Sequence, residues 1–425
     1  MMPPHGKRQH LPPLKVFSDL PDSVIDDILM RLPLRDAVRT SILSKKWRYN
    51  WCRLPQLTVD ETLWQTTKDL ISPTIKFTNI IYHLLALHTG PICKFILSIS
   101  DRVNCPKIDN LICFLSRNGI QHLVLQLPFR GNLYKLPSSF FTCSQLRHLV
   151  LRQCLIRSSP LFKGFDRLIS LELGGVTISS EFLGSLISKC PLLENLVLKH
   201  VDTSNPTEIS ALKLRSFVFI GNIHLIDLKI VPLLSKITYE PTEFSVEAGY
   251  NLAKIFESIP ALEHLSWSNY NFQVDDAGPA EVIPTRLPSA LNSLKRLYLS
   301  WITLGEFFEF SFALCLIRSS PYIEEIEIEG CVDVDGEYYE PVPRDAVDEI
   351  PASFSDMTFY HLRTVKIKSL AGADAEMQLI KVLLAKSPML VRMVIEPYEL
   401  EESLKAEITK FQRASSKAEI VYSVD

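Results

Sequence analysis

Ten histidines are the residues of this chain best suited to acid-base or metal chemistry, because imidazole titrates near neutral pH and binds transition metals. His83 and His88 are five residues apart, a spacing that does not place both on one helix face, as a zinc pair requires. His122, His148 and His264 each precede a leucine in a similar local context. We favour positions on an exposed surface for these three over a ligand or catalytic role, and we predict no metal site.

Other residue types give no stronger candidate for catalysis. The chain has no GxxxxGK[ST] loop, GxSxG elbow, HExxH pair or GxGxxG turn after a strand. Its nine cysteines form no CxxC pair, and an odd number argues against a complete set of disulfides. We therefore expect buried thiols in the cytoplasm, the nucleus or both, no catalytic residue and no cofactor. A hydrolase of unrecognised type is kept only as a residual hypothesis.

The composition narrows the class of partner. The 425 residues carry 45 Lys and Arg against 48 Asp and Glu, a formal charge of -3, which argues against a nucleic-acid partner. The longest apolar stretch, at 307–317, is shorter than the roughly 20 residues of a membrane span, and Glu309 interrupts it. The first residues, MMPPHGKRQHLPPLK, have no apolar core, so we expect no secretory signal and no membrane partner.

A repeated Leu-x-x-Leu-x-Leu pattern organises most of the sequence. About eleven copies, many of them degenerate, begin at Ile120, Leu146, Leu168, Leu193, Leu214, Leu234, Leu262, Leu294, Ile323, Leu362 and Leu390. The second half of each copy alternates apolar with other residues, which is typical of a short strand with one buried face. The separations scatter around those of a leucine-rich repeat.

Helical segments join several of these strands. Residues 181–189 and 375–386 have apolar residues at helical spacing. The segments SKCPLLENLVL, ESIPALEHLSW, RSSPYIEEIEI and AKSPMLVRMVI align without gaps, so that their prolines coincide. Because proline ends a helix, each would stop at a fixed distance from the next strand. The pattern predicts an α/β fold, a curved solenoid whose stacked repeats share one core and offer a surface to a macromolecule.

The residues ahead of the repeats predict a small helical module. Val24, Ile25, Ile28, Leu29 and Leu32 have helical spacing after Pro21. Pro33 ends this helix, and a second one is expected at 36–43 with Ala37, Val38 and Ile42 inward.

A third helix is expected after Ser44, which can N-cap it, with Leu43, Trp47, Trp51 and Leu54 on one face. Three helices in about 40 residues form too small a core to stand comfortably alone, so a partner is implied.

This segment, LPDSVIDDILMRLPLRDAVRTSILSKKWRYNW, resembles an F-box over about residues 17 to 60. The resemblance implies that the module binds a Skp-type adaptor, which links it to a cullin-RING ubiquitin ligase. The residues implied to contact the adaptor are Leu20, Pro21, Ile25, Ile28, Leu29, Leu32, Pro33, Val38, Leu43 and Trp47. The alternative is that these apolar residues only build the core of the module.

The C-terminal stretches LRTVKIKSLAGADAEMQLIKVLLAKSPMLVRMVIEPYE and KFQRASSKAEIVYSV resemble the FBD domain of plant F-box proteins that carry leucine-rich repeats. We expect a final strand from Ala418, and we favour a structural capping role for this segment. The expected organisation is a disordered N-terminus at 1–15, an F-box at 16–64, a solenoid cap at 65–119, leucine-rich repeats at 120–355, and the FBD domain with the last repeats at 356–425.

The resemblance implies the substrate-recognition subunit of a Skp-cullin-F-box ubiquitin ligase. The alternative is an interaction scaffold that uses the repeats without a ligase. The strand phase predicts which side chains face a protein substrate of unknown identity. They are His122, His148, Arg152, Lys199, Arg296, Tyr298, Glu325, Glu327 and Lys366. Ser300 is expected on the same face.

One predicted strand is entirely acidic on this face, with Glu325, Glu327 and Glu329, and lies between two basic ones. We favour charge neutralisation between neighbouring strands over a charged recognition patch.

Overall fold

The computed structural model describes residues 20–63, 73–99, 108–129, 132–160, 162–242, 255–256, 258–269, 285–331, 342–398 and 402–423. The expected disordered N-terminus at 1–15 lies outside these residues. The chain divides into two compact units, one comprising the residues up to Leu155 with Ser159–Phe165, and the other comprising Ile156–Ser158 and the residues from Asp166.

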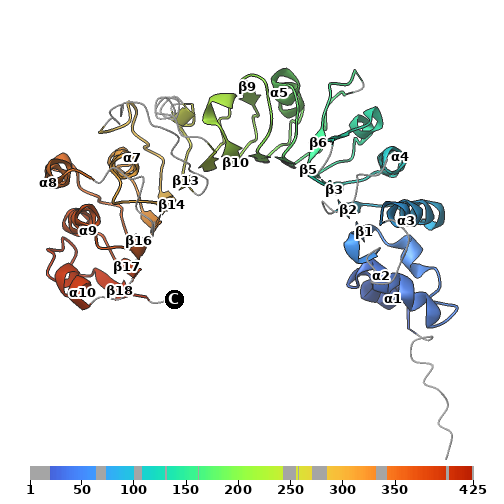
Figure 1. The fold of residues 1–425 in the computed structure, drawn as a ribbon, viewed down its shortest axis with the longest axis horizontal. Coiled ribbons are helices and arrows are strands. Elements are labelled where there is room, and N and C mark those ends of the chain that lie inside the picture. The colour runs from blue at the N-terminus through green and yellow to red at the C-terminus, as the bar shows by residue number, and fades with distance from the viewer. Residues whose placement is uncertain are drawn as a thin grey trace, which may run out of the picture. The chain divides into compact units, whose positions relative to one another are not determined.

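The first unit begins with short helices and continues into a parallel sheet (Figure 1). The helical part contains α1 (Asp22–Met30), α2 (Leu34–Arg39) and the 3-10 turns Thr40–Ile42, Asn50–Arg53 and Glu61–Leu63. The sheet follows the order β1 (Gln56–Val59), β2 (Lys94–Ser98), β3 (His122–Gln126) and β5 (His148–Arg152). The helices α3 (Pro73–Leu87) and α4 (Asp109–Arg117) connect these strands, and β4 (Tyr134–Lys135) pairs with β6 (Cys154–Leu155) beside them.

The second unit carries ten successive parallel strands of the same kind. They are β7 (Ser170–Gly174), β8 (Asn195–Lys199), β10 (Ser216–Gly221), β12 (Lys236–Pro241), β13 (His264–Ser268), β14 (Arg296–Ile302), β15 (Glu325–Gly330), β16 (Thr364–Leu370), β17 (Arg392–Pro397) and β18 (Glu419–Tyr422). A second small pair is formed by β9 (Thr207–Ser210) and β11 (Ile226–Ile230). The helices are α5 (Ser180–Ser188), α7 (Phe307–Arg318), α8 (Arg344–Ser353), α9 (Asp374–Lys386) and α10 (Glu402–Thr409).

All eleven predicted copies of the repeat contain a strand, and each joins a parallel ladder in equivalent register. Leu123 lies opposite Leu149, and Leu198 lies between Leu173 and Phe219. The apolar positions of the pattern are almost completely buried, whereas the residues between them are half-exposed. The pattern therefore stacks into the leucine-rich-repeat solenoid that it predicted, because each strand completes the burial of its neighbour.

Aromatic residues replace leucine in the middle of the second unit. Phe219 stacks on Tyr239, which meets Trp267 edge-on at 4.8 Å between ring centroids. Phe312 of α7 lies 4.6 Å from Trp267, measured between the same centres. These contacts fix α7 against the buried side of the strands.

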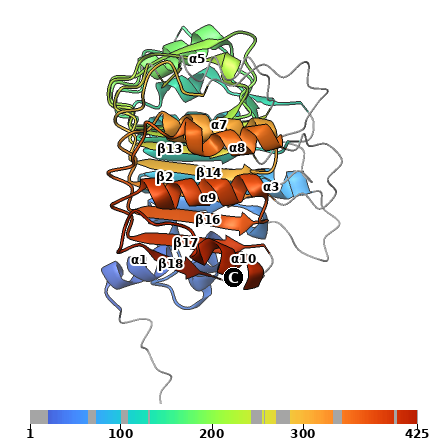
Figure 2. The same cartoon turned by 90° about the vertical axis from the view of Figure 1, so that its left-hand side faces the viewer.

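Helices cover one side of the strands within each unit, and the other side carries the half-exposed residues (Figures 1 and 2). We call this second side the open face. Figure 2 shows α7, α8 and α9 across the strands of the second unit. Helix α5 is capped by Ser179, whose Oγ accepts a hydrogen bond from the Phe182 amide at 3.3 Å.

The predicted helices and the strands at 94–98 and 419–422 are confirmed. The shared prolines follow α5, α7 and α9 by two or three residues. The strands β1, β4, β6, β9 and β11 were not predicted, and β1 lies within the range expected for the F-box.

The prediction of a third helix after Ser44 is wrong. Residues 45–49 form turns and only Asn50–Arg53 is helical, as a 3-10 turn. The hydroxyl of Ser44 caps nothing, since its Oγ is buried without a hydrogen-bond partner. Trp47, Trp51 and Leu54 are buried as expected, but Leu43 is exposed.

Two side chains also face the other way from their predicted direction. Ile42 was expected to point inward and is instead 87% exposed, because α2 ends at Arg39 and continues as a tighter 3-10 turn. Ser300 was expected on the open face and is buried. There β14 has a register shift between Ser300 and Ile302, with Trp301 at a φ of 58°.

Candidate functional site

Two prolines begin the helices of the N-terminal module. Pro21 and Pro33 lie just before α1 and α2, and the Pro21 carbonyl accepts hydrogen bonds from the amides of Val24 and Ile25 at 3.0 and 3.1 Å. The Pro33 carbonyl does the same for Asp36 and Ala37 at 2.9 Å. Each Leu-Pro pair therefore sets the direction in which a helix leaves the turn.

Polar contacts hold the irregular segment 44–53 against the start of α1. The Lys46 ammonium donates to the Leu20 carbonyl at 2.5 Å and lies 3.6 Å from the Asp22 carboxylate. Arg53 lies 3.6 Å from Asp26. The hydrogen bond and these ion pairs at the surface close the module around Trp47, which is 1% exposed.

The ten side chains predicted to contact an adaptor divide into three groups. Ile25, Leu29 and Trp47 are buried inside the module. Leu20, Ile28 and Leu32 are half-buried. The exposed members are Pro21, Pro33, Val38 and Leu43.

Sequence reasoning missed the most exposed large apolar side chain of the described residues, Ile42. Val38, at 37% exposed, is four residues before it, and Leu43, at 50% exposed, follows it. We call these three residues the Val38 patch. Val24, Met30 and Tyr49 are exposed as well, so six of the twenty exposed large apolar side chains among the described residues lie between 20 and 63. A soluble surface rarely concentrates apolar side chains in this way unless a partner covers them.

The open face of the second unit carries a ladder of opposite charges across β14, β15 and β16. Arg296 Nε lies 3.1 Å from Glu325 Oε2, and Lys366 and Lys368 lie 3.6 and 3.0 Å from Glu327 Oε1. The hydrogen bond to Glu327 raises the pKa of Lys368. Tyr298 donates its hydroxyl to Glu329, and burial followed by this bond raises the pKa of Tyr298 to about 12.

This arrangement confirms that neighbouring strands neutralise one another, because the acidic side chains of β15 are engaged by cations or a hydroxyl from the strands on both sides.

The open face of the first unit differs, because histidines meet there. His122 and His148 are register partners on β3 and β5, and their rings stack with centroids 4.4 Å apart and planes 16° apart. Burial is the main cause that lowers the pKa of His122, followed by His148, Lys94 and Arg147. The predicted adjacency of these two histidines is confirmed.

The remaining side chains predicted to face a substrate lie on the open face of their own unit. Arg152 ends β5, and Lys199 ends β8. All nine are half-exposed except Arg296, which is exposed. The ladder brings together Arg296, Tyr298, Glu325, Glu327 and Lys366 on three neighbouring strands, while Lys199 lies several strands away.

Comparison with known proteins identifies both parts of the chain. The F-box domain family matches residues 17–57, and the family described as "FBD-associated F-box protein At5g56370, LRR repeats" matches residues 108–328. The F-box/FBD/LRR-repeat protein At1g13570 of Arabidopsis thaliana is 34% identical over 421 residues, covering 96% of this chain and 98% of its own. The chain belongs to the plant F-box/FBD/LRR-repeat family.

Other members of the F-box/FBD/LRR-repeat family and related proteins align over shorter regions. The F-box/LRR-repeat protein At4g14103 of Arabidopsis thaliana is 31% identical over 44% of this chain and 50% of its own. Among solved structures, the plant peptide hormone receptor RGFR1 in complex with RGF2 aligns over 79% of this chain and 61% of its own at 14% identity. Its TM-score of 0.23 is too low to carry an inference.

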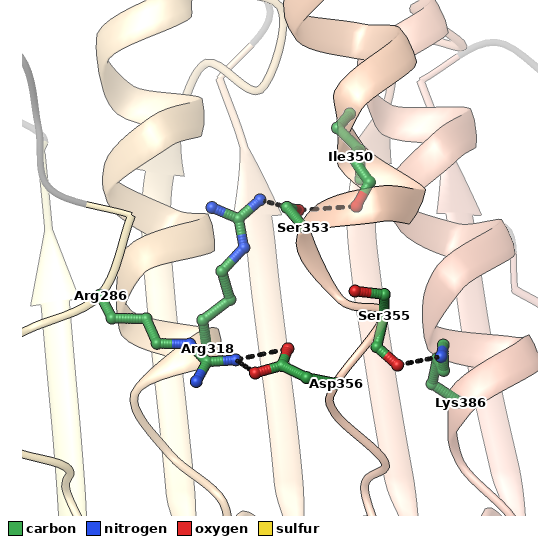
Figure 3. A network of polar contacts seen from close by, with 7 residues as sticks. All are labelled: Arg286, Arg318, Ile350, Ser353, Ser355, Asp356 and Lys386. Atoms are coloured by element: carbon green, nitrogen blue, oxygen red, sulfur yellow. Dashed lines mark hydrogen bonds and ion pairs between the residues drawn. The ribbon is translucent and has the colours of Figure 1, made fainter.

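In this F-box/FBD/LRR-repeat protein, the expected FBD segment is continuous with the repeats before it. The strands β16, β17 and β18 extend the same parallel ladder. The Arg286 guanidinium donates to both carboxylate oxygens of Asp356 at 2.8 and 2.9 Å, and Lys386 Nζ donates to the Ser355 carbonyl at 3.3 Å (Figure 3).

Arg318 reinforces this connection from α7. Its guanidinium donates to the Ser353 hydroxyl, which in turn donates to the Ile350 carbonyl at 2.6 Å (Figure 3). It also lies 4.8 Å above the Phe354 ring. Helix α8 is therefore fastened to α7 by side chains at its C-terminal end.

Further features bear on the expected chemistry. The eight cysteines among the described residues are free, and five of them are buried. Within the same residues, no group of three or more His, Cys, Asp or Glu is placed to hold a metal ion. No helix in the described part of the chain has the length and apolarity needed to cross a membrane.

Proposed function

We propose that this chain is the substrate-recognition subunit of a Skp-cullin-F-box ubiquitin ligase. In this proposal the F-box binds a Skp-type adaptor, and the open face of the repeats binds a protein substrate. The chain itself is non-catalytic and raises the effective concentration of the substrate near the transferring enzyme. It acts in the cytoplasm or the nucleus, a location favoured by its free thiols.

The observation that carries the proposal is the apolar surface of the F-box. The Val38 patch and the half-buried Leu20, Ile28 and Leu32 would together provide the anchors that a helical partner buries. Ile25, Leu29 and Trp47 would support this surface from beneath, because they are buried within the module. Ile42 is added to the residues predicted to contact the adaptor.

An interaction scaffold without a ligase, the alternative, leaves this apolar surface without a role. The repeats alone would suffice for such a scaffold, and six exposed apolar side chains in the F-box would then be an unexplained cost in solubility. We therefore favour the adaptor-binding function.

The test is affinity capture of the full chain with a co-expressed Skp-type adaptor. The variant Leu20→Ala/Pro21→Ala is expected to retain at least tenfold less adaptor than the unchanged chain, since it alters the start of α1 and one anchor. The control is Leu212→Ala, an apolar side chain that is 67% exposed on the second unit. Equal capture by both variants, with unchanged circular dichroism, would contradict the proposal.

Point variants suit this test better than deletion of residues 1–64. Such a deletion would remove β1, which pairs with β2 over four residues. The loss of a strand would expose an edge of the sheet and confuse loss of binding with loss of folding.

A further inference from the structure

The open face of the first unit has a basic row beside an aliphatic row. Register pairing places Lys94, His122 and His148 next to one another on β2, β3 and β5. The same pairing places Ile96, Val124 and Val150 in a parallel row two residues further along each strand. All six side chains are half-exposed.

The cationic groups at this row have no counter-ion from the chain. No carboxylate of the described residues lies within ion-pair distance of Lys94 or Arg147, and no protein hydrogen bond there engages the ring nitrogens of His122 or His148. The outward residues of β2, β3 and β5 include no Asp or Glu. These donors are therefore available to a ligand, in contrast to the lysines that engage Glu327 in the second unit.

The charge of the row decides which class of ligand it suits. A divalent metal would be repelled by Lys94 and Arg147, and stacked rings do not direct their nitrogens at one shared point. An anion would instead neutralise a cluster whose members raise one another's electrostatic energy. The aliphatic row beside it calls for apolar side chains in the same ligand.

We propose that the open face of the first unit binds an extended acidic segment of a protein in which carboxylate and aliphatic side chains alternate. Successive side chains of an extended chain point to opposite sides. A segment crossing β2, β3 and β5 would direct its carboxylates at Lys94, His122 and His148 and its aliphatic side chains at Ile96, Val124 and Val150. The proposal deepens the proposed function, on which it rests, by naming the chemistry of the substrate.

Binding of such a segment is coupled to protonation of the histidines. A carboxylate stabilises the imidazolium form, so the complex takes up protons that the free chain, with its lowered His122 pKa, does not hold at neutral pH. The groups that face the pair are Lys94 on β2 and Arg147 at the start of β5, and both keep their charge through this range. Affinity is expected to rise as the pH falls.

The experiment measures fluorescence anisotropy of a labelled peptide of three Glu-Val pairs on the full chain bound to its adaptor. We expect binding that tightens severalfold from about pH 8 to about pH 6. A peptide of three Lys-Val pairs should not bind, and one of three Glu-Ser pairs should bind more weakly. The double variant His122→Asn/His148→Asn should bind about tenfold more weakly at the lower pH.

The matched control is His264→Asn, which removes a half-exposed histidine at the equivalent position of β13. Glu263 lies close enough to His264 to act on its pKa, so a carboxylate already serves that site. This variant should leave peptide binding unchanged.

Adaptor binding and thermal unfolding are measured on the same preparations. If the adaptor binds but the Glu-Val peptide does not, or if His122→Asn/His148→Asn and His264→Asn weaken it equally, the inference is overturned and the proposed function stands. A folded chain that binds no adaptor contradicts the proposed function instead. The pH dependence of the unchanged chain keeps the inference testable if the double variant fails to fold, because a pH-independent affinity would also overturn it.

Discussion

The F-box and the repeats treat apolar side chains in opposite ways. In the repeats, Leu198 is flanked by Leu173 and Phe219 of the neighbouring strands and is completely buried. In the F-box, Val38 and Ile42 follow a similarly regular spacing but remain exposed. A repeat finds its partner in the next repeat of the same chain, whereas three short helical segments have no such neighbour. The difference indicates that the repeats complete their core alone and that the F-box is built to be completed by another protein.

The largest effect is expected where the chain completes its own core. The variant Leu198→Ala should lower the free energy of unfolding by about 2 to 5 kcal/mol, because it opens a cavity between three strands. The control is Val197→Ala in the same strand, which is half-exposed and should cost less than about 1 kcal/mol. Urea unfolding followed by circular dichroism measures both. Similar losses for the two variants would show that burial does not distinguish the faces of the strand.

A buried carboxyl gives the repeats a dependence on pH. Burial raises the pKa of Glu309 on α7 to about 7, although Asn269 and the Thr303 amide donate hydrogen bonds to it. The folded chain therefore holds a proton that the unfolded chain, with an ordinary carboxyl pKa of 4.5, has released. The stabilising contribution of this proton is fully present below about pH 4.5 and is lost as the pH rises to about 7, by about 3 kcal/mol at most.

The variant Glu309→Gln should remove this part of the pH dependence. Glutamine keeps one acceptor oxygen and adds a donor for Asn269 Oδ1, which has no hydrogen-bond partner among the described residues. Urea unfolding at about pH 5 and pH 8 is the measurement. The account would be wrong if the variant lost as much stability as the unchanged chain between these two values.

The smallest effect is expected on the charge ladder of the open face. Glu327→Gln should cost under about 1 kcal/mol of stability, because its ion pairs with Lys366 and Lys368 remain partly exposed. The loss should shrink in high salt. Glu396→Gln on β17 is the control, since no ion pair joins Glu396 to a described residue. A loss of several kcal/mol for Glu327→Gln alone would instead assign the ladder a structural role.

The repeats were predictable from the sequence because eleven copies carry the same information. The alternation at His122–Gln126 is weak evidence for a strand, but the same alternation returns at each copy with equivalent register. Neutralisation between Glu327 and the lysines of the next strand followed from this register. Close approaches of backbone were not predictable. A Cβ on Gly184 of α5 would lie 2.9 Å from the Glu208 carbonyl oxygen of β9, and no local pattern announces that contact.

The F-box surface was predicted less well, for a physical reason. Helical spacing relates Val38 to Ile42 only while the helix continues, and α2 gives way to a 3-10 turn at Thr40. The Thr40 hydroxyl donates to the Ala37 carbonyl at 2.6 Å within that change. A single short helix offers no second copy against which to check its end, so Ile42 was expected inside and lies outside.

The central claim is that the exposed apolar side chains of the F-box are the binding surface for a Skp-type adaptor. The measurement is calorimetric titration of the adaptor into the full chain and into the variant Val38→Ala/Ile42→Ala/Leu43→Ala. These side chains are exposed, so we expect a loss of affinity of at least a hundredfold with unfolding free energy unchanged within about 1 kcal/mol. Unchanged affinity in this folded variant would contradict the account.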